Sequence, residues 1–177
     1  MALALKWLLL ARRTPMKMAH MTQPNHHLAQ LNIARMLAPL TDPSMADFVV
    51  NLDPINQLAE DSPGFVWRLK GDGNDATSLR PFDDDFLIVN LSVWTSLEAL
   101  QAYVYHSDHT AFLRRRKEWF SKMADAMVVL WWVPVNHQPS LEEAKQRLLH
   151  LREHGETAQA FSFKKPVMPE IKSTDKP

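Results

Sequence analysis

The sequence has 177 residues, of which 46% are hydrophobic and 23% are charged, as is typical of one compact folded domain rather than a disordered or coiled-coil chain. Lys plus Arg and Asp plus Glu both number 20, so the formal net charge is zero and we expect neither nucleic acid nor an anionic membrane as a partner. Cysteine is absent, which excludes disulfides, thiolate nucleophiles and cysteine-ligated metal centres.

The two ends of the chain differ in composition from its middle. Residues 1–25 contain an apolar run that Lys6 interrupts and that Arg12 and Arg13 follow, and it is shorter than the roughly 20 residues needed to span a bilayer. The segment is either an organelle-targeting or surface-lying helix, or an extension ahead of a later start, and we predict a disordered or mis-assigned extension. We expect a cytoplasmic protein with one domain at 26–167 and a disordered tail at 168–177.

Strand-like and helix-like segments alternate in the first half of the domain. The pattern predicts a strand at 27–36, a kinked helix at 45–58 and a strand at 65–70, followed by a polar loop at 71–85. In the second strand, alternation places Phe65, Trp67 and Leu69 on one face and Val66, Arg68 and Lys70 on the other.

The second half repeats the pattern and then extends it. We predict a central strand at 86–94, a helix at 97–120, a strand at 127–135 near a sheet edge, a helix capped by Ser140 and ended by Gly155, and a short last strand at 160–163. The order strand, helix, strand, strand, helix, strand is that of a ferredoxin-like α+β fold with a split βαβ arrangement, to which a helix and a strand are added.

The strand at 86–94 is apolar on both faces, which indicates that both faces of the sheet are covered. In a ferredoxin-like fold the helices cover one face only. A homodimer that packs sheet on sheet would cover the other, because a two-fold interface needs one self-complementary patch. We therefore expect a dimeric α+β barrel.

The segment 103–120 holds the main candidates for chemistry. With Ser107 as an N-cap, a helical projection places His109 and Arg116 on the same face as Phe112 and Trp119. In one interpretation they face a cavity, where His109 is an acid, base or ligand and Arg116 stabilises an oxyanion. In the other, Arg116 pairs with a carboxylate such as Asp108 and His109 bonds a backbone carbonyl.

Further candidates lie on the strands and on the same helix. Trp67 either walls a pocket or belongs to the core, and polar residues at alternate strand positions line either a cavity or a wet dimer interface; these are Gln30, Asn32, Asn90 and Ser92. The predicted ligand-binding residues are Trp67, Arg68, Asn90, Tyr105, Phe112 and Trp119. His106 and His109 lack a nearby carboxylate motif, so we predict no metal site.

Several long blocks, including "INQLAEDSPGFVWRL", "FLIVNLSVWTSLEALQAYVYHSDHTAFLRRRKEWF" and "VVLWWVPVNHQPSLEEAKQRLLHLREHG", closely resemble a bacterial family known only as a domain of unknown function (DUF 3291). More distantly, "AYVYHSDHTAFL" is similar to a helix motif of the antibiotic-biosynthesis monooxygenase superfamily. That resemblance implies a dimeric barrel of ferredoxin-like subunits. The superfamily includes cofactor-independent oxygenases of polycyclic aromatic ketones and haem-degrading oxygenases, in which His109 would match the iron-binding histidine.

Two classes of function follow from these observations. In the first, the protein is a cofactor-independent, monooxygenase-like enzyme acting on an aromatic or polyketide-like small molecule, with His109 moving a proton and Arg116 stabilising an oxyanion. In the second, it is a non-catalytic dimeric protein that binds a ligand or has a structural role. We predict no cofactor, with haem as a minor alternative.

Overall fold

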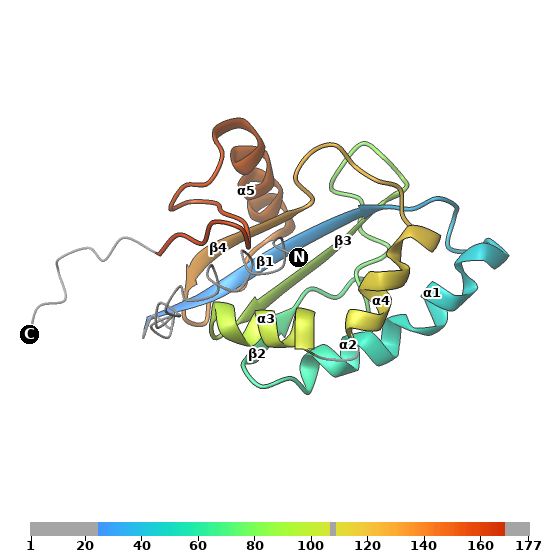
Figure 1. The fold of residues 1–177 in the computed structure, drawn as a ribbon, viewed down its shortest axis with the longest axis horizontal. Helices are drawn as coiled ribbons and strands as arrows, with labels where there is room; N and C mark the ends of the chain where they lie inside the picture. Colours follow the sequence, from blue (N-terminus) through green and yellow to red (C-terminus); the bar gives the residue numbers. More distant parts are fainter. Residues whose placement is uncertain (1–24, 107–108, 169–177) are drawn as a thin grey trace, which may run out of the picture.

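The computed structural model describes residues 25–106 and 109–168, which form one antiparallel sheet with helices on both sides (Figure 1). The sheet order is β2-β3-β1-β4, with strands β1 (His26–Arg35), β2 (Phe65–Arg68), β3 (Leu87–Trp94) and β4 (Val128–Pro134). Between β1 and β2 lie η1 (Pro43–Met45), α1 (Ala46–Val50) and α2 (Leu52–Glu60). Between β3 and β4 lie α3 (Leu97–His106), α4 (His109–Arg115) and η2 (Arg116–Glu118), and α5 (Leu141–His154) follows. This is the predicted ferredoxin-like α+β order.

Three predicted elements differ in detail. The helix expected at 45–58 is interrupted at Asn51, whose side-chain amide donates a hydrogen bond to the carbonyl of Asp47 at 2.7 Å. The helix expected at 97–120 consists of α3, α4 and η2. The last strand expected at 160–163 is reduced to isolated bridges, because Phe161 alone exchanges backbone hydrogen bonds with Leu130 of β4. Within the described part of the chain, no helix has the length and apolar character needed to span a membrane.

The sheet side that faces α5, here called the α5 side, is apolar from edge to edge. Its buried side chains form a single cluster with the inner stripe of α5, and the loop before β3 adds Ala76. The strand members are Ala29, Leu31, Ile33, Leu87, Val89, Leu91, Val93, Val129, Trp131 and Val133. Leu148 in the α5 stripe is 0% exposed. The chain itself therefore covers the face that was expected to need a second copy, so the apolar strands no longer argue for a sheet-on-sheet dimer.

The opposite side of the sheet, here called the helix side, faces α1–α4 and carries two separate apolar clusters. At one end, Trp94 and Trp132 pack with Leu97 and Leu100 of α3. At the other end, Met36 and Ile88 pack with Met45 and Trp119. The two clusters therefore lie over opposite ends of the strands. The adjacent indoles of Trp131 and Trp132 point to opposite sides of the sheet, as the strand pattern predicts.

The alternation predicted for β2 is wrong because the strand contains a register irregularity between Phe65 and Trp67. Phe65 pairs with Trp94 and packs on the helix side, where the two rings meet edge to face at 5.3 Å. Trp67 and Leu69 pack on the α5 side. An extra residue in one strand inverts the facing of every residue after it, so Phe65 and Arg68 share a side although they are three positions apart.

Candidate functional site

A group of polar side chains crosses the helix side of the sheet between its two apolar clusters. Arg68 of β2 pairs with Ser92 of β3, and Ser92 pairs with Gln30 of β1, so these three lie in one row. Asn90 and Asn32 pair in the next row. Because directly paired residues and residues two apart share a side, all five point toward the helices. We call this set, Gln30, Asn32, Arg68, Asn90 and Ser92, the polar belt.

Hydrogen bonds satisfy the centre of the first row. The Ser92 hydroxyl donates to Gln30 Oε1 at 3.0 Å and accepts from the indole Nε1 of Trp94 at 3.0 Å. Gln30 and Ser92 are 9% and 6% exposed, so both would be costly to leave without partners. This part of the belt is closed and rigid.

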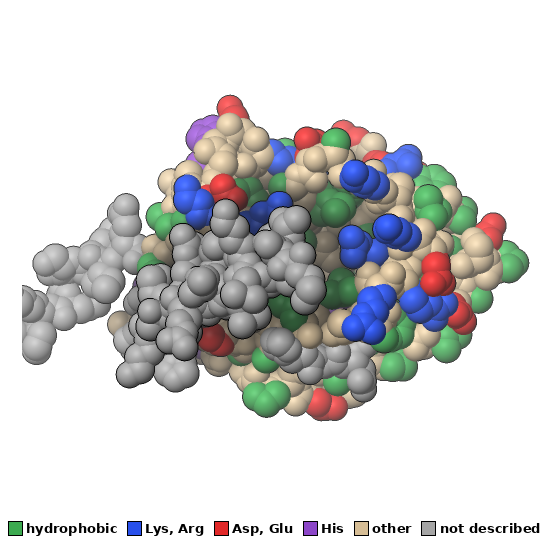
Figure 2. All heavy atoms as spheres, viewed as in Figure 1, with side chains coloured by type: hydrophobic (Ala, Val, Ile, Leu, Met, Phe, Trp, Pro, Cys, Tyr) green, Lys and Arg blue, Asp and Glu red, His purple; other side chains and the backbone are tan. Residues whose placement is uncertain are grey.

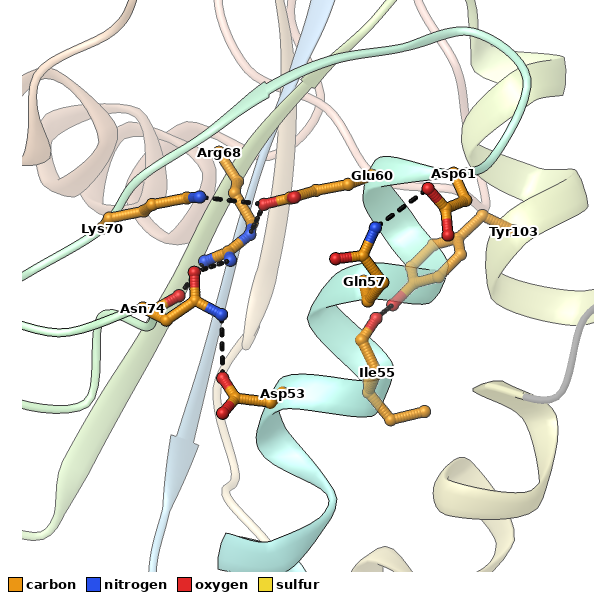
Figure 3. Close-up of polar contacts among 9 residues, drawn as sticks. All are labelled: Asp53, Ile55, Gln57, Glu60, Asp61, Arg68, Lys70, Asn74 and Tyr103. Atoms are coloured by element: carbon orange, nitrogen blue, oxygen red, sulfur yellow. Dashed lines mark hydrogen bonds and ion pairs between the residues drawn. The ribbon is translucent and has the colours of Figure 1, made fainter.

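Arg68 is the buried cation of the belt, and it is fully engaged by its neighbours (Figure 3). Its Nε donates to Glu60 Oε1 of α2 at 2.8 Å, while its terminal nitrogens donate to the carbonyl and side-chain oxygens of Asn74. Lys70 also lies 3.1 Å from Glu60 Oε1. The hydrogen bond from Lys70, followed by that from Arg68, lowers the pKa of the Glu60 carboxyl. Arg68 is therefore paired with Glu60, a carboxylate that it shares with Lys70, and it links β2 to α2.

The second row of the belt is open to solvent. Asn90 is exposed although it lies in the middle of a central strand between buried Val89 and Leu91. Its partner Asn32 is half-buried. In Figure 2 a recess with a hydrophobic floor is visible on the face of the molecule in view, with Lys and Arg side chains gathered along one edge. On the helix side, Asn90 is therefore accessible to a ligand and Asn32 is accessible in part.

Tyr103 and His109 form an aromatic stack on Trp94 in the helix layer, here called the Tyr103–His109 wall. Tyr103 of α3 stacks on Trp94 at 5.1 Å between ring centroids, and His109 lies against Tyr103 at 4.8 Å. The Tyr103 hydroxyl donates a 3.4 Å hydrogen bond to the carbonyl of Ile55 in α2 (Figure 3). Burial raises the pKa of Tyr103, and nearby Arg68 opposes that change. The phenol therefore stays protonated and donates its hydrogen to the Ile55 carbonyl.

His109 is half-buried at the start of α4. Burial lowers the pKa of its imidazole, and the contact between Nδ1 and the carbonyl of Val104, at 3.4 Å, opposes that shift. The ring is therefore neutral near pH 7, which is the state that can accept a proton. The predicted bond between His109 and a backbone carbonyl is present.

Arg116, predicted to face the interior beside His109, is exposed. The α-helix ends at Arg115 and continues as the 3-10 turn η2, so a projection at 100° per residue does not hold there. The Arg116 side chain donates to the carbonyl of Leu113 at 3.3 Å. The carboxylate partner that sequence suggested, Asp108, lies outside the described residues.

The predicted aromatic residues do not form one pocket. Trp119 is 2% exposed and belongs to the apolar cluster at the far end of the sheet, where Phe112 stacks on it at 6.2 Å. Trp67 lies on the α5 side. Tyr105 is 48% exposed and contacts Phe163. Of the predicted site residues, Arg68 and Asn90 belong to the belt, and His109 is connected to it through Tyr103 and Trp94.

Sequence reasoning did not assign a role to Tyr103, which joins His109 to the belt. Its contacts with Trp94 and His109 depend on how α3 and α4 pack, and no local pattern encodes them. The alternation of Gln30, Asn32, Asn90 and Ser92, in contrast, did identify the belt. The structure places this alternation against the helices rather than at a sheet-to-sheet interface.

Haem is the minor cofactor alternative, with His109 as the residue that would hold the iron. Iron binds in the plane of an imidazole through a ring nitrogen, and Nδ1 of His109 lies 3.4 Å from the carbonyl of Val104. Two hollows of about 480 and 380 Å³ lie at β2 and on α5, and His109 lines neither, so neither of them is a pocket for a haem bound by His109.

The fold defines the structural class of the protein, and comparison with known proteins then gives its family. The strand order and helix positions define a ferredoxin-like α+β protein. The chain belongs to the family described as "Domain of unknown function (DUF3291)", whose model matches residues 27–176. No curated protein matches the sequence.

Solved structures with a similar fold are distant in sequence. SnoaB, a cofactor-independent oxygenase from Streptomyces nogalater, is 15% identical, with 66% of this chain and 97% of that chain covered and a TM-score of 0.41. A monooxygenase from the gene ActVA-Orf6 of Streptomyces coelicolor, in complex with nanaomycin D, is 14% identical over 67% and 96%, with a TM-score of 0.39. NE2512 from Nitrosomonas europaea, of unknown function, is 17% identical over 68% and 96%, with a TM-score of 0.38.

Proposed function

We propose that the protein binds a small molecule on the open row of the polar belt, with the Tyr103–His109 wall beside it. The observation that carries this proposal is the exposure of Asn90 in the middle of a central strand whose other side chains are buried. The amides of Asn90 and Asn32 each offer donors and an acceptor, which suit carbonyl and hydroxyl groups. Aromatic walls favour a flat ring. The expected ligand is therefore an oxygenated aromatic or polyketide-like compound.

Ligand-observed NMR with hydroxylated anthraquinones and anthrones tests this proposal. Asn90→Leu and Asn32→Leu should each weaken binding about three- to tenfold, the usual value of one or two hydrogen bonds. The control is Gln138→Leu, a polar-to-apolar change at an exposed loop position away from the belt. Equal binding by Asn90→Leu and the unaltered protein, or no binding of any compound in the panel, would contradict the proposal.

A cofactor-independent oxygenation is a second candidate, favoured by the neutral imidazole of His109. In this scheme His109 takes a proton from a ring methylene next to a carbonyl, and the resulting enolate gives electrons to O₂. Overall, the methylene and O₂ yield a ketone and water, so no external reductant is consumed. The belt amides would hold the enolate oxygen.

Oxygen uptake with anthrone tests the second candidate. His109→Ala should lower the rate by about 10²- to 10⁴-fold, the usual contribution of a general base. Arg114→Ala, at an exposed position on α4, serves as the matched control. Arg116→Ala in the same assay tests the oxyanion contact predicted from sequence, which the exposed position of Arg116 does not favour. Undiminished turnover by His109→Ala would remove the assigned role.

A homodimer is also part of the proposal, but its interface has to lie outside the face covered by α5. Among the described residues the edge strand β2 pairs with β3 alone, and it carries exposed Val66, so this sheet edge is a candidate for a two-fold contact. Light scattering on the full chain gives the molar mass directly. A value of one chain across the micromolar range would exclude the dimer.

A further inference from the structure

The outer surface of α5 carries two histidines one helical turn apart. His150 and His154 are four positions apart, so their side chains lie on one face of the helix. Their ring centroids are 4.5 Å apart and the ring planes are tilted by 37°. Both rings line a surface hollow of about 380 Å³ on α5, far from the polar belt because α5 packs on the other side of the sheet.

One of the two rings is already oriented by a partner outside the pair. His150 Nε2 lies 3.0 Å from the hydroxyl oxygen of Thr157, in the turn that follows α5. The backbone N–H groups of Gln159 and Ala160 donate to the same oxygen at 3.2 and 3.3 Å, so the turn holds it in place. Metal-binding histidines commonly donate one ring N–H to an oxygen while the other ring nitrogen binds the ion, so binding through Nδ1 of His150 requires Nε2–H to donate to the Thr157 oxygen.

The charges around the pair favour a cation. Glu153 Oε2 lies 3.7 Å from His154 Nδ1, and Glu143 lines the same hollow. Arg147 is the cation on this surface, but it donates to the carbonyl of Gln159 at 3.1 Å and lies 4.0 Å from Glu143. The positive charge of Arg147 is thus partly compensated.

We propose that His150 and His154 chelate one divalent transition-metal ion, with water completing its coordination. Two imidazoles select Zn²⁺, Ni²⁺ or Cu²⁺ over Mg²⁺ and Ca²⁺, which prefer oxygen ligands. Within the described residues no three His, Asp or Glu side chains converge, so this is a two-histidine site with exchangeable water rather than a closed structural centre. A bound ion stabilises the last turn of α5, which covers the apolar side of the sheet.

Calorimetric titration of the full chain, produced without a histidine tag, tests the site with ZnCl₂ and NiCl₂. His154→Ala removes one of two ligands at a largely exposed position and should weaken the tightest binding step by about tenfold or more. His150→Ala should have the same effect. His137→Ala is the matched control, because His137 is an exposed histidine that contacts Glu143 at 2.8 Å but lies outside the pair.

Thermal unfolding provides an independent measurement. Zn²⁺ should raise the Tm of the unaltered protein and of His137→Ala, but not that of His154→Ala, whereas MgCl₂ should raise none. A circular dichroism spectrum of each variant, recorded before heating, shows whether the variant is folded. Unchanged affinity in His154→Ala, an equal loss in His137→Ala, or an equal response to Mg²⁺ would each overturn the proposal.

Discussion

The two sides of the sheet are built differently although the same four strands form both. On the α5 side, every strand residue named above belongs to one apolar cluster that α5 closes. On the helix side, two apolar clusters cover the ends of the strands, and the polar belt separates them. Continuous packing gives the α5 side its contribution to stability, while the interruption on the helix side leaves amide groups that a ligand can reach. Substitutions on the two sides should therefore have different consequences.

The largest expected effect is on the α5 side. Leu148→Ala empties a site that is 0% exposed and should lower the free energy of unfolding by about 2–5 kcal/mol. Its neighbour Leu149 is 40% exposed, so Leu149→Ala should change that free energy by less than about 0.5 kcal/mol. Urea denaturation followed by circular dichroism measures both. Similar losses in the two variants would mean that α5 does not pack on the sheet in solution.

A smaller effect is expected within the belt, where its two rows should respond differently. Ser92→Ala removes the acceptor for the Trp94 indole and the donor to Gln30, and should cost about 1–3 kcal/mol. Asn90→Ala, two residues away on the same side, should cost less than about 0.5 kcal/mol because Asn90 is exposed. Urea denaturation followed by circular dichroism measures the free energy of unfolding of both variants. A cost for Asn90→Ala equal to that for Ser92→Ala would show that the open row is in fact closed.

Local patterns predicted the strands and the polar belt because both depend on neighbouring residues. Alternation with period two along β1 and β3 places Gln30, Asn32, Asn90 and Ser92 on one side whatever the rest of the chain does. The stripe of α5, including Leu148, was likewise visible in the sequence. The surface on which α5 packs could not be predicted, since an apolar stripe on a helix does not specify which apolar face of the protein the helix covers. The expectation that a second copy covers this side of the sheet arose from that missing contact.

Site residues were misplaced where the backbone departs from regular geometry. The irregularity in β2 places Trp67 and Arg68 on the sides of the sheet opposite to those expected from Phe65 by simple alternation. No residue type in that strand predicts the irregularity. The change from α4 to the 3-10 turn η2 moves Arg116 off the face that a regular helix would give it. His109 comes before that change, and its half-buried position beside Tyr103 agrees with the helical projection.

The smallest expected effect is the dependence of stability on pH, which depends on the half-buried imidazole of His109 and not on the amides of the open row. Burial lowers the pKa of His109 in the folded protein relative to the unfolded chain, where it is about 6.5. Between the two values the unfolded state binds more protons, so stability is greatest above about pH 6.5 and falls as the pH decreases toward the folded-state pKa. His109→Gln should flatten this part of the profile, as measured by urea denaturation between about pH 5.5 and 8.

Leu149→Ala alters no titratable group and should retain the pH slope of the unaltered protein. An identical slope in His109→Gln would mean that His109 is solvated in the folded state. In that case the wall beside the belt would be open to water, and the neutral base that the oxygenation scheme requires would be absent at mildly acidic pH. A flattened slope would place the imidazole in a desolvated position and make its neutral form available next to a ligand on the belt.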